Sequence, residues 1–110
     1  MKTTRKELYK IFKGAKELLL NPRTTWIKGS LSSGPNSYCT FGAIYMTATG
    51  SPYSCTHPKS IDAYNFMRHR VGFTAISIHS LLGSTKGNDS EDTTFEDVIG
   101  ALTTAKRLTR

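Results

Sequence analysis

Residues 4–20 carry hydrophobic side chains at the period of an α-helix. These positions recur three or four residues apart, so on a helix they share one face with an arc of about 120°. Thr4 and Glu7 have the spacing of a capping box, and Pro22 ends the pattern because proline disfavours helical geometry in the residue before it. The pattern predicts an amphipathic helix over residues 4–20. The residues of its apolar face are Leu8, Ile11, Phe12, Ala15, Leu18 and Leu19.

Residues 22–37 lose this period, and their composition predicts extended chain and turns. Residues 24–27 have strand propensity, and Gly29 and the run Gly34-Pro35-Asn36 are turn signals. The only tryptophan, Trp26, lies in this segment. Such a tryptophan is most often a core residue that closes one end of a helix bundle, and the alternative is an anchor for a partner protein.

The densest apolar run, residues 38–46, predicts a short buried helix. We expect it to begin near Tyr38 or Cys39, with Asn36 or Ser37 as its cap, and to stop at Gly50. The small residues at positions 42 and 43 indicate that a neighbouring segment approaches closely. A glycine inside a helix costs about 1 kcal/mol relative to alanine and usually has a packing reason.

The second half of the chain holds two further helical patterns. Residues 59–70 predict a helix with Ser60 as its cap, whereas residues 74–82 fit a helix or a strand. Residues 83–92 are polar and predict a loop. The last helix is expected to start with Thr93 as its cap and Glu96 as the partner in a capping box. Its apolar stripe consists of Phe95, Val98, Ile99, Leu102 and Ala105.

These elements predict a mainly α fold. A chain of 110 residues forms one domain with one modest core, so we expect a compact single helical domain over residues 1–110. It should contain three to four helices, with a short extended or hairpin segment near Trp26 as an addition. The residues expected in the core are Leu8, Ile11, Phe12, Leu19, Trp26, Phe41, Ile44, Tyr64, Phe95, Val98, Ile99 and Leu102.

Composition is that of an ordinary globular protein, with 37% hydrophobic and 21% charged residues. No apolar run reaches the length of about 18 residues that a membrane-spanning helix needs, so we expect no membrane association. The N-terminal segment lacks the apolar stretch and cleavage site of a secretory signal, which favours a cytoplasmic location. Cys39 and Cys55 are too few for a disulfide scaffold, and we expect two free thiols.

The formal net charge of +7 raises nucleic acid as a partner. Lys6, Lys10 and Lys13 lie on the helix face opposite the apolar stripe. They form either a solvated face or a surface that follows phosphate groups. Basic residues at the end of the last helix complement its dipole, so part of the charge has a structural use.

Cys39 is the candidate nucleophile. At the start of a helix, amide donors and the helix dipole lower the pKa of a thiol, whereas the alternative is a buried filler residue. A cysteine hydrolase also needs a base, and His57, His69 and His79 lie in no recognisable motif. Cys39, Cys55 and His57 lack the paired ligand spacing of a zinc site, so we expect no metal and no cofactor.

Four short motifs occur in order along the chain. They are W-x-x-G at residues 26–29, C-x-x-G-A at 39–43, the pair Asn88-Asp89, and T-x-E-x-V at 94–98. As an ordered set they resemble a small bacterial and phage family of unknown function. The resemblance implies a compact, mainly helical domain and favours a helix around residues 74–82. It also implies a phage or mobile-element source, and it carries over no catalytic residue.

The Asn88-Asp89 pair has two interpretations. In the first, it forms a turn in which Asp89 accepts hydrogen bonds from backbone amides ahead of the last helix. In the second, it belongs to a functional site, which requires Cys39, Asn88 and Asp89 to converge in one cleft.

Three hypotheses for function follow. The favoured one is a small phage-type accessory protein that binds a host or phage protein and modulates, by inhibition, a host protein machine in the host cytoplasm. Its expected contact residues are Trp26, Tyr38, Tyr45 and Tyr53. The alternative is a basic nucleic-acid-binding protein that uses the three lysines of the first helix. A cysteine-dependent hydrolase that uses Cys39 is the third and least favoured.

Overall fold

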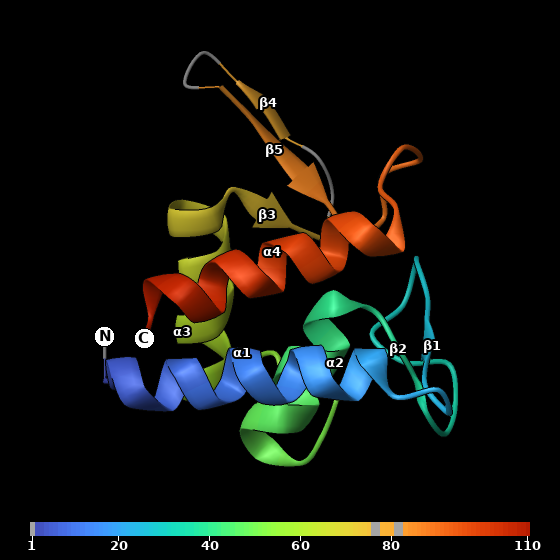
Figure 1. Cartoon of the computed structure of the whole chain (residues 1–110), viewed down its shortest axis with the longest axis horizontal. Helices are drawn as coiled ribbons and strands as arrows, with labels where there is room; N and C mark the ends of the chain where they lie inside the picture. The colour runs from blue at the N-terminus through green and yellow to red at the C-terminus, as the bar shows by residue number, and fades with distance from the viewer. Residues whose placement is uncertain (1, 76–77, 81–82) are drawn as a thin grey trace.

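The computed structural model describes residues 2–75, 78–80 and 83–110 of the chain. The helices are α1 (Arg5–Leu20), α2 (Thr40–Thr49), α3 (Pro58–Phe66), the π-helical turn η1 (Met67–Val71) and α4 (Phe95–Leu108). The strands are β1 (Thr25–Trp26), β2 (Ser37–Tyr38), β3 (Phe73–Thr74), β4 (Ile78–Ser80) and β5 (Gly83–Gly87). The fold is therefore mainly α with a small sheet, which confirms the predicted fold class (Figure 1).

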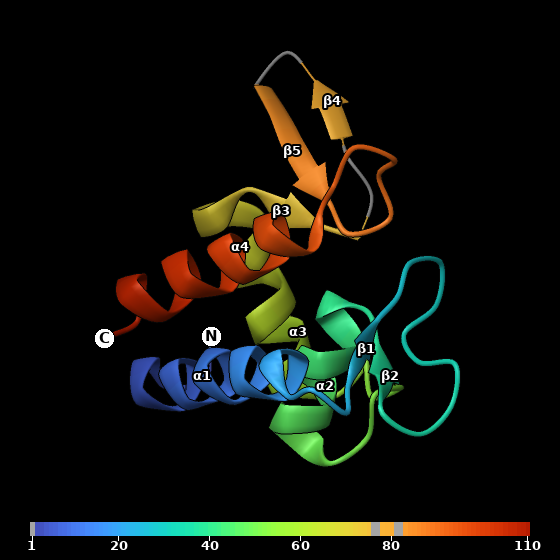
Figure 2. The ribbon, with the colours of Figure 1, turned by 45° about the vertical axis from the view of Figure 1, so that its right-hand side comes forward.

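The core lies between α1 and the helices on either side of it. α1 packs against both α2 and α4, and α2 packs against α3 (Figures 1 and 2). The predicted core residues that are buried are Leu8, Ile11, Phe12, Leu19, Phe41, Ile44, Val98 and Leu102. The others are partly buried and pack against this core, namely Trp26, Tyr64, Phe95 and Ile99. The helical periodicity of α1 and α4 thus identified the buried faces correctly.

The predicted cap of α1 is correct, whereas that of α2 is not. Thr4 and Glu7 form the predicted capping box of α1. The predicted caps of α2 were wrong, because Ser37 pairs in β2 and the chain stays extended through Cys39. Cys39 itself is the N-cap, and Gly50 ends the helix in the left-handed region, as predicted.

The caps of α3 and α4 also differ from the prediction. α3 begins one residue before the predicted start, because Pro58 suits the first turn of a helix, and His57 is its cap in place of Ser60. α4 is capped by Thr94 with Asp97 as the partner in the capping box. Thr93 is unavailable for this role, since its hydroxyl is buried and donates to the carbonyl oxygen of Gly87 at 2.5 Å.

The segment between η1 and α4 forms strands where a helix and a loop were expected. β3 pairs with β5 in parallel, with Phe73 opposite Lys86, and β4 pairs with β5 antiparallel, with His79 opposite Ser84. The helix favoured around residues 74–82 was therefore wrong for 78–80, and the loop predicted over 83–92 was wrong for 83–87. Residues 76–77 and 81–82 lie outside the described residues. The predicted extended segment near Trp26 is confirmed as the parallel pair β1–β2.

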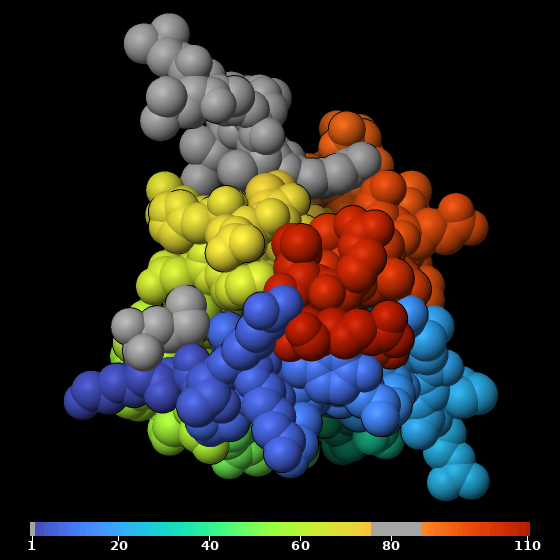
Figure 3. Space-filling model, turned by 60° about the vertical axis from the view of Figure 1, so that its left-hand side comes forward, coloured from blue at the N-terminus to red at the C-terminus, as the bar shows by residue number. Residues whose placement is uncertain are grey.

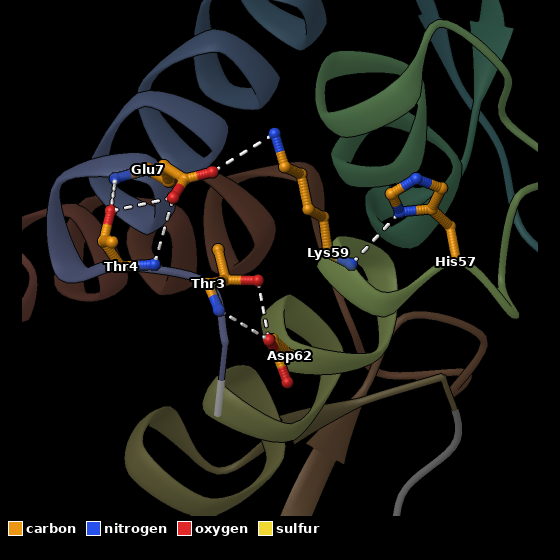
Figure 4. A network of polar contacts seen from close by, with 6 residues as sticks. All are labelled: Thr3, Thr4, Glu7, His57, Lys59 and Asp62. Atoms are coloured by element: carbon orange, nitrogen blue, oxygen red, sulfur yellow. Dashed lines mark hydrogen bonds and ion pairs between the residues drawn. The ribbon is translucent and has the colours of Figure 1, made fainter.

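The N-terminal segment is tied to α3. Thr3 donates from its backbone nitrogen and its hydroxyl to Oδ2 of Asp62, at 3.0 and 2.6 Å. Lys59 forms an ion pair with Glu7 at 3.1 Å (Figure 4). These contacts fix the first turn of α1 against α3, and thereby bring Arg5 to the same end of the molecule as η1.

Candidate functional site

The motifs of the chain converge on the side chain of Asn88, which is only 1% exposed. Its Oδ1 accepts hydrogen bonds from Nε1 of Trp26 at 2.7 Å and from the backbone nitrogen and hydroxyl of Thr40 at 2.9 and 2.6 Å. Its Nδ2 donates to the carbonyl oxygen of Ile27 at 3.2 Å and to Oδ1 of Asp89 at 2.8 Å. Every polar atom of this amide is therefore used within the protein, which makes Asn88 a structural junction.

Asp89 extends the junction toward solvent. Its Oδ1 accepts from the backbone nitrogen of Gly29 at 2.9 Å, while its own backbone nitrogen donates to the carbonyl oxygen of Ala75. Asp89 thus accepts a hydrogen bond from a backbone amide of the distant W-x-x-G segment. The turn interpretation had instead expected its partners to be backbone amides just ahead of α4. The side chain of Asp89 is exposed, and Oδ2 accepts no hydrogen bond from the described residues.

Cys39 is the N-cap of α2 and lies next to Thr40, which is bonded to Asn88. Its Sγ accepts a hydrogen bond from the backbone nitrogen of Gly42 at 3.3 Å, and the residue is 6% exposed. Burial raises the pKa of the thiol above its ordinary value, the charge of Asp89 acts in the same direction, and the amides of Gly42 and Phe41 act against both. This direction agrees with the buried-filler interpretation of Cys39 rather than with a lowered thiol pKa, because burial outweighs the amide donors at the helix start.

These residues line one open cavity of about 240 Å³, which we call the motif cleft. Its lining side chains include Cys39, Tyr45, Cys55, Tyr64, Asn88 and Asp89. The convergence that a site at Cys39, Asn88 and Asp89 required is thus present. A neighbouring base is not evident among the described side chains, because neither His57 nor His69 lines this cavity, and the side chain of His79 lies outside the described residues.

The four aromatic residues predicted to contact a partner have different environments. Tyr38 and Tyr45 are 8% and 5% exposed, so both lie in the core. Trp26 is half-buried, donates to Asn88 and stacks near Phe95 with ring centroids 6.0 Å apart. Tyr53 alone of the four is exposed. A partner-binding role for these residues stays a prediction, and the structure leaves Tyr53 as its most accessible member.

A second hollow lies at the opposite end of α4 from the motif cleft. It has a volume of about 430 Å³ and lies between the first turn of α1, η1 and the last turn of α4. We call it the basic cleft, and its lining residues are Arg5, Leu8, Asn65, Phe66, His69, Arg70, Leu108 and Thr109. An adjoining hollow shares Arg5 and Thr109 and adds Lys6, Tyr9 and Arg110. None of the described residues that line either hollow is acidic.

Figure 3 shows the face on which the first turn of α1, η1 and the last turn of α4 meet. Of the predicted lysines, Lys6, Lys10 and Lys13 are all exposed on α1, and Lys6 borders the adjoining hollow. Sequence reasoning missed Arg5, His69 and Arg70 as a group. Their one available signal was the basic run at residues 68–70, which needed the position of η1 to connect it with the first turn of α1.

Among residues 2–75, 78–80 and 83–110, no three His, Cys, Asp or Glu side chains are placed to hold a metal ion. Within the same ranges, no helix has both the length and the apolar character needed to cross a bilayer.

Comparison with known proteins assigns the chain to a family. No curated protein and no solved structure matches it significantly. A match to a family description covers residues 3–108, which is nearly the whole chain. The chain belongs to the family of unknown function DUF6197.

Proposed function

We propose that this protein is a non-enzymatic binding protein that holds an acidic, amphipathic segment of a partner protein in its basic cleft. The observation that carries the proposal is the combination of an apolar floor and a basic rim. Leu8 and Leu108 supply the floor, while Arg5, and Arg70 lying over the ring of Phe66, supply the rim. A helix with apolar residues on one face and carboxylates beside them is complementary to such a surface.

The apolar floor favours a protein segment over nucleic acid. Proteins that bind single strands expose aromatic rings on which bases stack. Here the guanidinium of Arg70 lies over the ring of Phe66 at 5.6 Å from its centroid, so this ring is already covered. Tyr9 borders only the adjoining hollow. Nucleic acid is therefore the alternative, which the exposed lysines of α1 support through their charge.

A binding role also agrees with the state of Cys39. A cysteine nucleophile reacts as its thiolate, and burial raises the pKa of this thiol. The cavity beside it is lined by neither His57 nor His69. We further propose that binding modulates, by inhibition, the machine to which the partner belongs, because a small domain that occupies a recognition segment blocks its other contacts.

A direct binding measurement tests the proposal. A fluorescent helical peptide with leucines at positions i, i+3, i+4 and i+7 and glutamates between them would be titrated with the protein and followed by anisotropy. We expect saturable binding that Arg70→Glu weakens on the order of tenfold, equivalent to about 1.4 kcal/mol. Lys13→Glu is the matched control, because Lys13 is exposed on α1 and lines neither hollow.

Two further probes separate the alternatives. A peptide of glutamates without leucines should bind more weakly, since it cannot fill the apolar floor. A single-stranded oligonucleotide that binds more tightly than the amphipathic peptide, and loses affinity steeply as salt increases, would replace the proposal with the nucleic-acid reading. The proposal is also overturned if no peptide binds, or if Arg70→Glu and Lys13→Glu have equal effects.

A further inference from the structure

The motif cleft is lined by Asp89, whose carboxylate has one oxygen without a hydrogen bond from the described residues. Both hydrogen bonds to the Asp89 carboxylate, from Gly29 and Asn88, end on Oδ1. They hold the plane of the carboxylate in place while Oδ2 accepts nothing from the described residues. Asp89 lines the cleft, and a carboxylate oxygen without a partner on such a residue is suited to accept a hydrogen bond from a ligand.

Tyr45 supplies a second, independent sign of a ligand. The residue is 5% exposed, it lines the same cleft, and its hydroxyl has no hydrogen-bond partner among the described residues. No fully enclosed side-chain oxygen or nitrogen of the described residues lacks a hydrogen bond, so this hydroxyl is in part accessible, and the residue that carries it lines the cleft. Burial raises the pKa of Tyr45 far above neutrality, which keeps the phenol uncharged. A neutral phenol oxygen can accept a hydrogen bond from a cationic group.

Among the described residues that line the cleft, Asp89 is the one carboxylate and none is a lysine or an arginine, although the whole chain is basic. Of the eight acidic residues, five lie within residues 89–97, where the chain has no lysine or arginine. The nearby Lys28 is directed elsewhere, because its Nζ donates to the carbonyl oxygens of Ser90 and Glu91 at 2.6 and 3.4 Å and lies over the ring of Trp26. An anion would be repelled by Asp89, whereas a cation would be attracted.

We infer that the motif cleft binds a primary ammonium group. Its N–H groups would donate to Oδ2 of Asp89 and to the hydroxyl oxygen of Tyr45, and its hydrocarbon chain would lie against the aromatic lining at Phe41 and Tyr64. The cavity of about 240 Å³ is smaller than the roughly 300–1,000 Å³ of pockets for drug-sized molecules, so it fits an alkylamine of a few carbons. The same chemistry is carried by a free small amine and by a lysine side chain of a protein.

Amide NMR of the ¹⁵N-labelled protein tests this inference with defined probes. Titration with n-butylammonium chloride at constant ionic strength should give saturable shifts around Gly29 and Cys39, whereas 1-butanol, its neutral counterpart, should not. Asp89→Asn keeps an oxygen that can accept the hydrogen bond from Gly29 and removes the charge, and we expect it to weaken butylammonium binding by about tenfold or more.

Nα-acetyl-lysine methylamide is the second probe. Equal binding of both probes points to a lysine side chain as the ligand, and binding of butylammonium alone points to a free amine.

Three controls keep the result specific to the cleft. Tyr45→Phe removes a hydroxyl that has no hydrogen-bond partner among the described residues, so the protein should keep its fold and lose affinity for butylammonium. Glu91→Gln removes a neighbouring acidic charge that does not line the cleft and should leave the affinity nearly unchanged. Arg70→Glu, in the basic cleft, should also have no effect, so this inference and the proposed function fail separately. Shifts that do not saturate, equal shifts with 1-butanol, or unchanged affinity in both Asp89→Asn and Tyr45→Phe would overturn the inference.

Discussion

Asn88 is the residue at which separate parts of the chain are joined. One amide oxygen serves Trp26 and both donors of Thr40, although these residues are 62 and 48 positions away in the sequence. A buried amide that makes all its hydrogen bonds fixes the relative positions of its partners. Trp26 is therefore better explained as a structural residue whose indole nitrogen needs this acceptor than as a free anchor on the surface.

The two cysteines differ in exposure, and this predicts their reactivity. Cys39 is buried and Cys55 is exposed. At pH 7 we expect iodoacetamide to modify Cys55 at least about ten times faster than Cys39, because burial raises the pKa of the Cys39 thiol and keeps it protonated. The rate at Cys39 should increase as pH rises toward that pKa. Mass spectrometry of tryptic peptides over time measures both rates.

Single-cysteine variants provide the check on this prediction. Cys55→Ser isolates Cys39 in a protein whose fold can be confirmed by circular dichroism. Rapid modification of Cys39 at pH 7 in this variant would contradict the prediction and would support the cysteine-hydrolase hypothesis.

At the scale of elements, α2 lies unusually close to the loop that precedes it. Gly42 is in the first turn of α2, and a Cβ added there would overlap the carbonyl oxygen of Leu31. That carbonyl accepts the backbone nitrogen of Cys39 at 3.2 Å, so loop and helix start are held together. The small residue at position 42 thus has the packing reason that the sequence indicated.

Two glycine substitutions with opposite expected effects test this packing. Gly42→Ala should lower the free energy of unfolding by about 1–3 kcal/mol, because the overlap is with backbone that cannot rotate away. Gly100→Ala is the matched control in α4, where an added Cβ meets nothing within 4 Å. It should raise stability by about 0.5–1 kcal/mol through helix propensity. Urea unfolding followed by circular dichroism measures both, and equal effects would refute the role of Gly42.

At the scale of the whole molecule, charge is separated along α4. Acidic residues gather before and within its first turns, while Lys106, Arg107 and Arg110 lie at its end. This order complements the helix dipole. The two proposed sites differ in charge as well, since Asp89 lines the motif cleft and Arg5 and Arg70 line the basic cleft.

The tie between the N-terminal segment and α3 predicts a pH dependence of stability. Hydrogen bonds from Thr3 hold the pKa of Asp62 below its ordinary value of 3.8. A carboxyl whose pKa is lower in the folded state stabilises the protein above its unfolded pKa, and this contribution is lost as pH falls through the folded value. Asp62→Asn should therefore lower the melting temperature at pH 7 and have a smaller effect near pH 3. Asp92→Asn, an exposed residue before α4, is the control, and an effect of Asp62→Asn that is independent of pH would contradict the assignment.

The sequence by itself determined the parts of this protein that depend on local periodicity. The apolar faces of α1 and α4, the capping box at Thr4 and the end of α2 at Gly50 follow from residues that are close in the chain, because helix geometry brings positions three and four apart onto one side. The residues of the Asn88 junction were also visible as short motifs, although their roles were not.

Only the tertiary structure decided how distant segments meet. The short strands after η1 could not be predicted, since their hydrogen-bond partners lie elsewhere in the chain and short apolar runs fit a helix or a strand equally well. The convergence of Cys39, Asn88 and Asp89, and the meeting of Arg5 with Arg70, arise from packing among helices. The raised pKa of Cys39 belongs here too, because burial is a property of the folded molecule and outweighs the local amide donors that the sequence placed beside the thiol.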